Sequence, residues 1–303
     1  MAEFLLNFGS ALIAFGPFVS LFALVIYQKA QLVIVVTSAA FCYLVGSMGA
    51  GLLWSLLDVI SLSGSPLAAI VPGVFFPFVA RCAFVSLYHR VEQVIQISLA
   101  QHDEDNQNTA DNNNDARDND WNQVTKLKLA LNDASCGIAA GVGYGGMHAL
   151  LLFGTLLASD VQNKTGVRYQ DSCPMVPSLV VSALYAAFFF VLDMFWMLFT
   201  FFGMRRRLVF HRGDGELYDG AQVDRRLGAW FGNTRNGGNV ALLFALGSHL
   251  VAALLTTADY WNYGCSVSIP ALGVMVLVVA YIFWAGIGRI YLPKPAEDPH
   301  HES

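Results

Sequence analysis

Seven long apolar stretches constrain this 303-residue sequence, in which 55% of the residues are hydrophobic and 13% are charged. A helix needs about 20 mostly apolar residues to cross the roughly 30 Å hydrocarbon core of a bilayer, and each stretch meets that length. The stretches are Phe4–Tyr27, Leu32–Leu57, Leu67–Tyr88, Leu129–Leu157, Pro177–Met204, Asn239–Ala258 and Val267–Tyr291. The sequence therefore predicts an all-α polytopic membrane protein, with residues 1–303 forming a single seven-helix transmembrane domain.

Basic residues are concentrated in alternate connections between these stretches. The connection between the fourth and fifth stretches carries only Lys164 and Arg168. The connection between the fifth and sixth stretches carries Arg205, Arg206, Arg207, Arg212, Arg225, Arg226 and Arg235. Because positively charged loops stay in the cytosol, this pattern predicts a lumenal or extracellular amino terminus and a cytosolic carboxyl terminus.

Three connections differ in composition. Residues 102–120 (HDEDNQNTADNNNDARDND) are acidic and have no apolar periodicity, which predicts a disordered cytosolic loop. Residues 205–238 form a basic cytosolic loop with interspersed aromatic residues. This loop is either a stop signal with a connecting segment or a surface for anionic lipid headgroups. Residues 159–176 form the lumenal loop between the fourth and fifth stretches.

Two features of the lumenal side involve covalent chemistry. Asn163 begins an Asn-Lys-Thr sequon, so it is a possible glycosylation site. Cys173 and Cys265 both fall in lumenal connections, where disulfides persist, so a bridge between them is possible. The sequence alone does not fix the geometry that such a bridge requires.

The fourth stretch contains three glycines spaced four apart, Gly137, Gly141 and Gly145. Residues at this spacing lie on one face of a helix, where glycines leave a smooth groove. In lipid, close packing of helix backbones is a main source of helix association. The ladder therefore predicts a helix-packing surface, and we expect a helix of another subunit to occupy it.

Ionisable side chains inside apolar stretches are costly and need an explanation. Asp193 in the fifth stretch and His249 in the sixth lie at similar depth when residues are counted from the span ends. We therefore predict an intramembrane polar pair between them, with the alternative that each bonds a separate hydroxyl or carbonyl group. His148 lies about a turn nearer the lumen and is interpreted as another polar packing residue.

Other functions were weighed against these residues. His148, Asp193 and His249 are a conceivable zinc ligand set for a metal-dependent membrane hydrolase, although none has paired-ligand spacing. One deep aspartate does not supply the two carboxylates of an aspartyl protease. A seven-helix receptor fits the topology. Such receptors carry an Asp-Arg-Tyr-like triplet at the cytosolic end of the third span, whereas here the sequence reads Ser86–Leu87–Tyr88–His89–Arg90, and the seventh stretch has no Asn-Pro-x-x-Tyr-like segment. No nucleotide-binding motif occurs.

Four segments resemble the anterior-pharynx-defective family, the seven-span scaffold subunit of gamma-secretase. The similarity extends over most of the chain. The segments are Ala14–Phe15–Gly16–Pro17, the glycine ladder, Phe195–Trp196 followed by Arg205–Arg206–Arg207, and Gly247–Ser248–His249–Leu250. The chain departs from the family pattern at Asp193, where the family usually carries a second histidine, and in its longer cytosolic loops.

The resemblance implies a role for the whole chain. It implies a non-catalytic subunit that supports presenilin, nicastrin and presenilin enhancer in one complex, which cleaves type I membrane proteins inside the bilayer. It implies that the glycine ladder is important for assembly. It also implies a lipid environment in the endoplasmic reticulum, Golgi and plasma membrane, with no cofactor, no metal and no nucleic acid.

Overall fold

A computed structural model describes residues 2–59, 66–108, 133–158, 169–209 and 235–286, and every structural statement below concerns those residues. They contain seven helices long and apolar enough to cross a membrane, which confirms the predicted fold class. The long helices are α1 (Ala2–Leu21), α2 (Ala30–Val59), α3 (Pro66–Asn108), α5 (Asp133–Ala149), α7 (Ser178–Val209), α8 (Arg235–Leu255) and α9 (Cys265–Gly286).

Shorter elements extend or connect these helices. A π-helical turn, η1 (Phe22–Ile26), follows α1, and a second, η2 (Leu150–Gly154), follows α5. A 3₁₀ turn, η4 (Thr256–Tyr260), follows α8. The strands β1 (Tyr169–Gln170) and β2 (Cys173–Pro177) pair antiparallel directly before α7.

Several helices begin or end where the sequence predicted a loop. Helix α3 continues to Asn108, so residues 102–108 are helical and that part of the predicted disordered loop is corrected; residues 109–120 lie outside the described residues. Helix α7 includes Arg205–Val209 and α8 begins at Arg235, which leaves 210–234 of the basic loop outside them. Asn163, the first residue of the sequon, lies outside the described residues.

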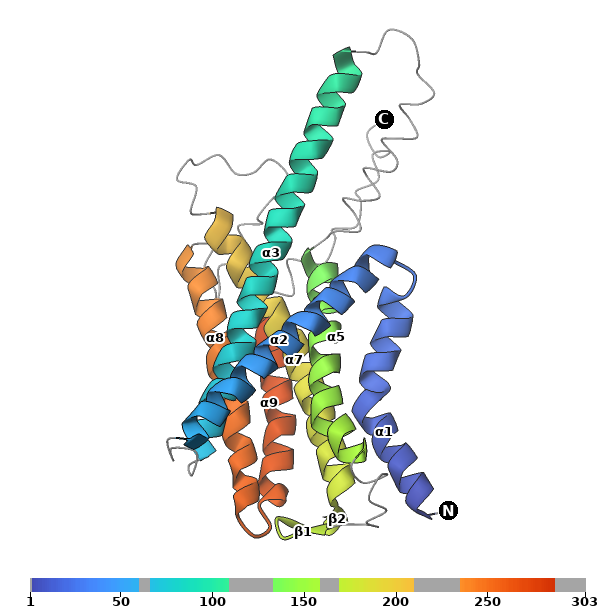
Figure 1. Cartoon of the computed structure of the whole chain (residues 1–303), viewed down its shortest axis with the longest axis vertical. Helices are drawn as coiled ribbons and strands as arrows, with labels where there is room; N and C mark the ends of the chain where they lie inside the picture. Colours follow the sequence, from blue (N-terminus) through green and yellow to red (C-terminus); the bar gives the residue numbers. More distant parts are fainter. Residues whose placement is uncertain (1, 60–65, 109–132, 159–168, 210–234, 287–303) are drawn as a thin grey trace, which may run out of the picture.

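Helix α5 occupies the centre of the bundle. It packs against α2, α7 and α1, and 67% of its most apolar segment is buried, compared with 17% for α1 and for α9. Helix α7 is the second central helix, with α5 and α1 on one side and α8 and α9 on the other. Helix α2 crosses the bundle obliquely (Figure 1). The fold therefore consists of two central helices surrounded by five others.

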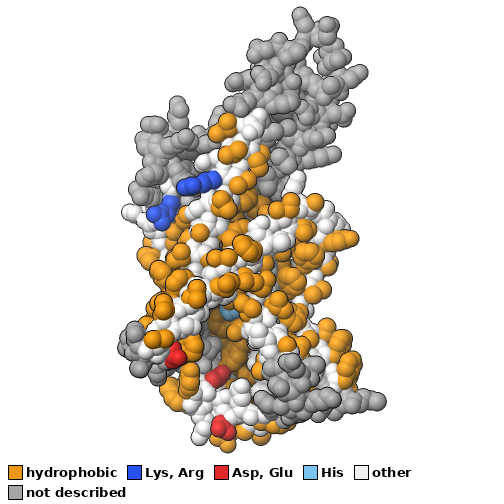
Figure 2. All heavy atoms as spheres, viewed as in Figure 1, with side chains coloured by type: hydrophobic (Ala, Val, Ile, Leu, Met, Phe, Trp, Pro, Cys, Tyr) orange, Lys and Arg blue, Asp and Glu red, His pale blue; other side chains and the backbone are white. Residues whose placement is uncertain are grey.

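The two ends of the bundle differ. Helix α3 projects well beyond the other helices at one end, and the start of α1 and the β1–β2 hairpin lie at the opposite end (Figure 1). On the face shown in Figure 2, the described Lys and Arg side chains gather at the end where α3 projects, and the Asp and Glu side chains lie in the other half. The described surface between them is largely apolar.

Candidate functional site

The glycine ladder of α5 is in contact with α7 of the same chain. A Cβ atom added at Gly141 would lie 2.7 Å from the Cα atom of Met194, and one added at Gly145 would lie 2.8 Å from the carbonyl oxygen of Phe190. At Gly137 the added atom would meet a side chain, Cδ2 of Leu198, at 2.8 Å. The contacted residues on α7 are also four apart and run in the opposite direction. The ladder therefore brings two antiparallel backbones together.

This arrangement corrects one expectation. The sequence predicted close packing at the ladder, and the packing is present, but the partner is an internal helix and not a helix of another subunit. The physical reason is that a glycine face specifies how closely a neighbour approaches, without specifying which chain supplies that neighbour. The ladder acts first on the fold of this chain.

Two further glycines make α5 a hub for three helices. A Cβ atom at Gly143 would lie 2.1 Å from the carbonyl oxygen of Val36 on α2. At Gly146 it would lie 2.5 Å from the ring of Phe18 on α1. Helix α5 thus presents side-chain-free positions to α1, α2 and α7, which explains its burial.

A charged cluster lies beside this hub and joins three helices. Arg81 Nη2 on α3 donates to Asp193 Oδ1 on α7 at 2.6 Å, and His148 Nδ1 on α5 donates to Asp193 Oδ2, also at 2.6 Å. The side chains of Arg81 and Asp193 are fully buried, and that of His148 is 13% exposed. Both carboxylate oxygens are therefore engaged by basic groups. A buried carboxylate is tolerated when it is paired and hydrogen-bonded in this way.

Aromatic rings enclose the cluster. The guanidinium carbon of Arg81 lies 4.6 Å from the ring centre of Tyr144 and 5.4 Å from that of Trp196, so the cation is close to two π faces. Tyr43 stacks on His148 with a centroid distance of 5.0 Å. The hydroxyl of Tyr144 donates to the carbonyl oxygen of Pro77 on α3. These contacts hold the charged groups in one geometry and exclude most of the solvent.

The predicted pair between Asp193 and His249 is wrong. The imidazole of His249 stacks on Trp196 with a centroid distance of 4.2 Å, and its Nδ1 atom has no hydrogen-bond partner among the described residues. Trp196 donates from Nε1 to Ser248 Oγ at 2.8 Å. Counting residues from span ends gives the depth of a side chain but not its direction around the helix. His148 takes the place that the sequence assigned to His249.

Sequence reasoning also missed Arg81, which lies inside the third predicted stretch. The sequence contained a signal for this residue. A lone arginine deep in an apolar helix needs a partner, and Asp193 is the acidic residue that lies deep within a predicted stretch. Among the described residues, no three His, Cys, Asp or Glu side chains lie close enough together to hold a metal ion. The hydrolase alternative, which needs His148, Asp193 and His249 around one metal, therefore lacks its ligand set in that part of the chain.

A second polar cluster lies at the hairpin end. The hydroxyl of Tyr185 on α7 donates to Asp259 Oδ2 in η4, and Ser268 Oγ on α9 donates to Asp259 Oδ1 at 2.7 Å. Next to it, Cys173 of β2 and Cys265 of α9 form a disulfide with a Cα–Cα distance of 5.6 Å. These bonds connect the beginnings of α7 and α9 to the turn that follows α8.

The fold and the buried site define a class of protein: an all-helical, seven-span membrane protein whose polar groups connect its own helices. A model of the Aph-1 protein family matches residues 5–289, and the chain belongs to that family. The gamma-secretase subunit APH1-like of Arabidopsis thaliana is 26% identical over 267 residues, which are 87% of this chain and 85% of that relative. The resemblance found in the sequence is confirmed.

Proposed function

We propose that this chain is the non-catalytic scaffold subunit of a gamma-secretase complex, supporting presenilin, nicastrin and presenilin enhancer. The observation that carries the proposal is family membership over nearly the whole chain, together with a relative named as a gamma-secretase subunit. In this role, the chain supports the intramembrane processing of type I membrane proteins without contributing a catalytic group.

The buried cluster supports a structural role. An intramembrane aspartyl protease needs two carboxylates that share a proton. Asp193 instead has a cation and an imidazole on its two oxygens, and its side chain is fully buried. A substrate peptide has no access to such a carboxylate. The cluster serves to fix α3, α5 and α7 relative to one another.

The internal packing of the glycine ladder changes how a scaffold of this kind works. The ladder supplies a rigid inner frame, and the outward faces of the peripheral helices remain for partners and lipid. On α9 the exposed side chains include Val274, Leu277 and Trp284, with exposed fractions of 55–70%. We infer that partner helices dock on outer faces whose positions the α5 frame determines.

Orientation follows from the distribution of charge. The described basic side chains gather at the end where α3 projects, which favours the cytosol for that end. The disulfide lies at the other end, which favours an oxidising compartment there. We propose a lumenal or extracellular amino terminus, residence in the endoplasmic reticulum, Golgi and plasma membrane, and Asn163 as a glycosylation acceptor.

The test is reconstitution of the complex in cells that lack their own Aph-1 subunit. The tagged chain is expressed, and the membranes are purified in mild detergent. We expect presenilin, nicastrin and presenilin enhancer to co-purify with it, and cleavage of a type I substrate to be restored. Recovery of the chain alone would overturn the complex assignment. Substrate cleavage by the chain purified free of presenilin would overturn the non-catalytic assignment.

A pair of variants connects this test to the structure. Gly141→Leu places a side chain against the backbone of Met194, so we expect loss of the folded chain and of co-purification together. Gly73→Leu is the matched control, since no heavy atom lies within 4 Å of a Cβ added there. If Gly141→Leu keeps the thermal stability of the purified chain but loses the partners, the ladder contacts another subunit directly.

A further inference from the structure

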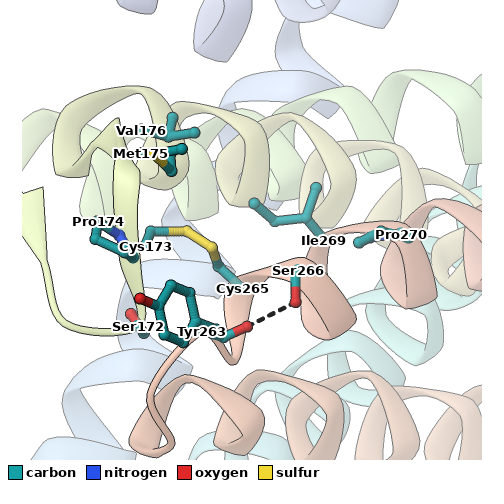
Figure 3. A pocket seen from close by; sticks show the side chains of 10 residues that line it. All are labelled: Ser172, Cys173, Pro174, Met175, Val176, Tyr263, Cys265, Ser266, Ile269 and Pro270. Atoms are coloured by element: carbon teal, nitrogen blue, oxygen red, sulfur yellow. Dashed lines mark hydrogen bonds between the residues drawn. A yellow bond between two sulfur atoms is a disulfide. The ribbon is translucent and has the colours of Figure 1, made fainter.

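An apolar pocket lies between β2 and the first turns of α9 (Figure 3). It has a volume of about 310 Å³, and its ten lining residues come from two segments, 172–176 and 263–270. The Cys173–Cys265 disulfide bridges these segments, and the side chains of Met175, Val176 and Ile269 contribute to the walls. None of the ten lining residues is charged.

The two serine hydroxyls of the pocket already have partners. Ser266 Oγ donates to the carbonyl oxygen of Tyr263 at 2.7 Å, as the dashed line in Figure 3 shows. Ser172 Oγ donates to Gln170 Oε1 at 3.5 Å. A polar ligand would therefore lose its hydration without gaining strong hydrogen bonds from these hydroxyls. The chemistry of the walls selects an apolar occupant.

The pocket is continuous with the outer face of α9. Ser266 and Pro270 line the pocket and are exposed, and Val267 and Val274 are exposed at 61% and 59% on the same helix. In a membrane-spanning helix such a face meets acyl chains. The pocket therefore opens where the lipid-facing surface reaches the hairpin.

The surroundings place this opening at the membrane–water interface. Tyr260 and Trp261, at the end of the preceding span, are 77% and 71% exposed, and amphipathic aromatic side chains concentrate at bilayer interfaces. Tyr263 has a φ of 61°, in the left-handed region that a non-glycine residue rarely adopts. Strain of this kind persists where surrounding structure imposes it, often at ligand contacts. Here it accompanies a ring that lines the pocket.

We propose that this pocket binds part of one acyl chain of a bilayer phospholipid with a zwitterionic headgroup. Its volume is at the lower end of the roughly 300–1,000 Å³ of ligand pockets, which suits one chain segment. One turn of a helix, about 10 Å across and 5.4 Å long, occupies on the order of 400 Å³, which exceeds the volume of the pocket. The described charged residues of the two adjoining turns, Asp171 and Asp259, are acidic and disfavour an anionic headgroup. The proposal does not depend on the gamma-secretase assignment.

Photolabelling of the full-length chain in nanodiscs tests the proposal. The discs contain phosphatidylcholine with a trace of phosphatidylcholine that carries a diazirine on an acyl chain. After irradiation, mass spectrometry locates the adducts. We expect adducts on the peptides with Met175 and Ile269 to be at least five-fold more frequent than adducts on the peptide with Leu243, an exposed residue of α8. Equal labelling of these peptides would show general lipid contact only and overturn the proposal.

Variants separate the pocket from its surroundings. Ile269→Trp fills the pocket and should reduce the adducts on the Met175 peptide at least three-fold, whereas Val274→Trp, on the exposed face outside the pocket, should leave them unchanged. Met175→Asp provides a second test that does not challenge folding, because Met175 is 88% exposed. An acyl chain beside the new carboxylate would cost it hydration, so labelling should fall. Labelling unaffected by both pocket variants would overturn the proposal.

Two further probes test the identity of the occupant. A phosphatidylserine probe of the same chain length should label the pocket less than the phosphatidylcholine probe. A diazirine sterol should not compete with the phosphatidylcholine probe. Preferential labelling by phosphatidylserine or by the sterol would overturn the assignment to a zwitterionic phospholipid. In the purified complex, cross-links from residues 172–176 to another subunit, with loss of lipid adducts, would make the pocket a protein contact and likewise overturn it.

Discussion

The two sides of α7 are packed mainly by different means. Toward α5, the contact is made where side chains are missing, so the backbone atoms of Met194 and Phe190 approach the glycine face directly. Toward α8 and α9, large rings make most of the contact, such as Phe199 against Phe244 and Phe283 with centroid distances of 5.0 and 5.5 Å. One glycine pair, Gly203 on α7 and Gly238 on α8, brings two backbones together there, since a Cβ atom on either would lie 2.7–2.8 Å from the carbonyl oxygen of the other. One helix therefore has an interface that is mainly backbone on one side and mainly aromatic on the other.

The difference shows that the two kinds of contact have different roles in a membrane bundle. Backbone contacts cannot adjust to an added atom, because the neighbouring helix must move as a unit. Aromatic side chains can rotate or be replaced by smaller groups, so the interface tolerates change. Because lipid supplies no hydrophobic drive for helix association, close packing has to come from such shape complementarity. The α5 side determines where the helices lie, and the α8–α9 side fills the remaining volume.

The largest effect is expected where the charged cluster joins α7 to the α5 side. Asp193→Ala leaves the buried guanidinium of Arg81 without its partner, and breaking a buried pair typically costs about 3–5 kcal/mol. The free energy of unfolding in bicelles, measured by steric trapping, should fall by that amount. Replacing both residues, with Arg81→Met and Asp193→Leu, should recover much of it.

A double-mutant cycle on the same residues distinguishes the two histidines. Asp193 should couple strongly to Arg81 and to His148, and its effect should be additive with that of His249→Ala, since His249 stacks on Trp196. Strong coupling of Asp193 to His249 with none to His148 would show that the contacts described above are wrong.

The next effect tests the backbone interface by adding one carbon. Gly141→Ala places its Cβ 2.7 Å from the Cα atom of Met194, so α7 must shift, and overpacking of this kind costs about 1–3 kcal/mol. The thermal midpoint in detergent should drop clearly. Gly51→Ala and Gly73→Ala have open space at the added atom and should change it little. Equal midpoints for all three variants would show that the backbone interface accommodates an added atom, contrary to the close contact described above.

A smaller effect is expected when atoms are removed from the aromatic interface. Phe199→Leu removes part of a buried ring but leaves an apolar side chain that neighbouring rings can pack against, so we expect a loss of about 1 kcal/mol, well below the roughly 3–5 kcal/mol of a Phe→Ala truncation. Its midpoint should therefore lie above that of Gly141→Ala, although more of the side chain has changed. The reverse order would mean that the aromatic layer, and not α5, determines the helix positions.

The smallest effect is expected at the hairpin end of the aromatic side. Tyr185→Phe removes the hydroxyl that donates to Asp259, and hydrogen bonds in membrane proteins average about 0.6 kcal/mol in double-mutant cycles. Asp259 keeps its bond from Ser268. The free energy of unfolding, measured under the same conditions, should change by well under 1 kcal/mol. A loss comparable with that of Asp193→Ala would give this cluster a larger role than its geometry indicates.

Most of the architecture could be predicted because the bilayer sets one length scale for every span. Apolar runs identified all seven helices, and glycine spacing identified the face of α5 that packs closely, although not that α7 of the same chain occupies it. Helix ends were less predictable, since polar sequence at the end of a span still continues as helix when its backbone bonds are satisfied. Helix α3 illustrates this, with polar residues up to Asn108.

The buried site could be predicted only in part. The residue type identified Asp193 as a buried charge that needs a partner. Whether His148 or His249 is that partner depends on how each helix is rotated about its axis, and the depth of a residue in its span does not give that rotation. Arg81 was missed because it was not recognised as an intramembrane charge. Its pairing with Asp193 is recoverable from charge balance alone, whereas the stacking of His249 on Trp196 requires coordinates.

The Arg81–Asp193 pair has a consequence for biogenesis. The two residues are 112 positions apart, so Arg81 is made well before its counter-ion exists. At about 5–20 residues per second, the ribosome needs on the order of 5–20 s to reach Asp193. During that time a lone cation in hydrocarbon is unfavourable. The third helix therefore reaches its final, charge-paired position only after the aspartate-bearing helix has been made.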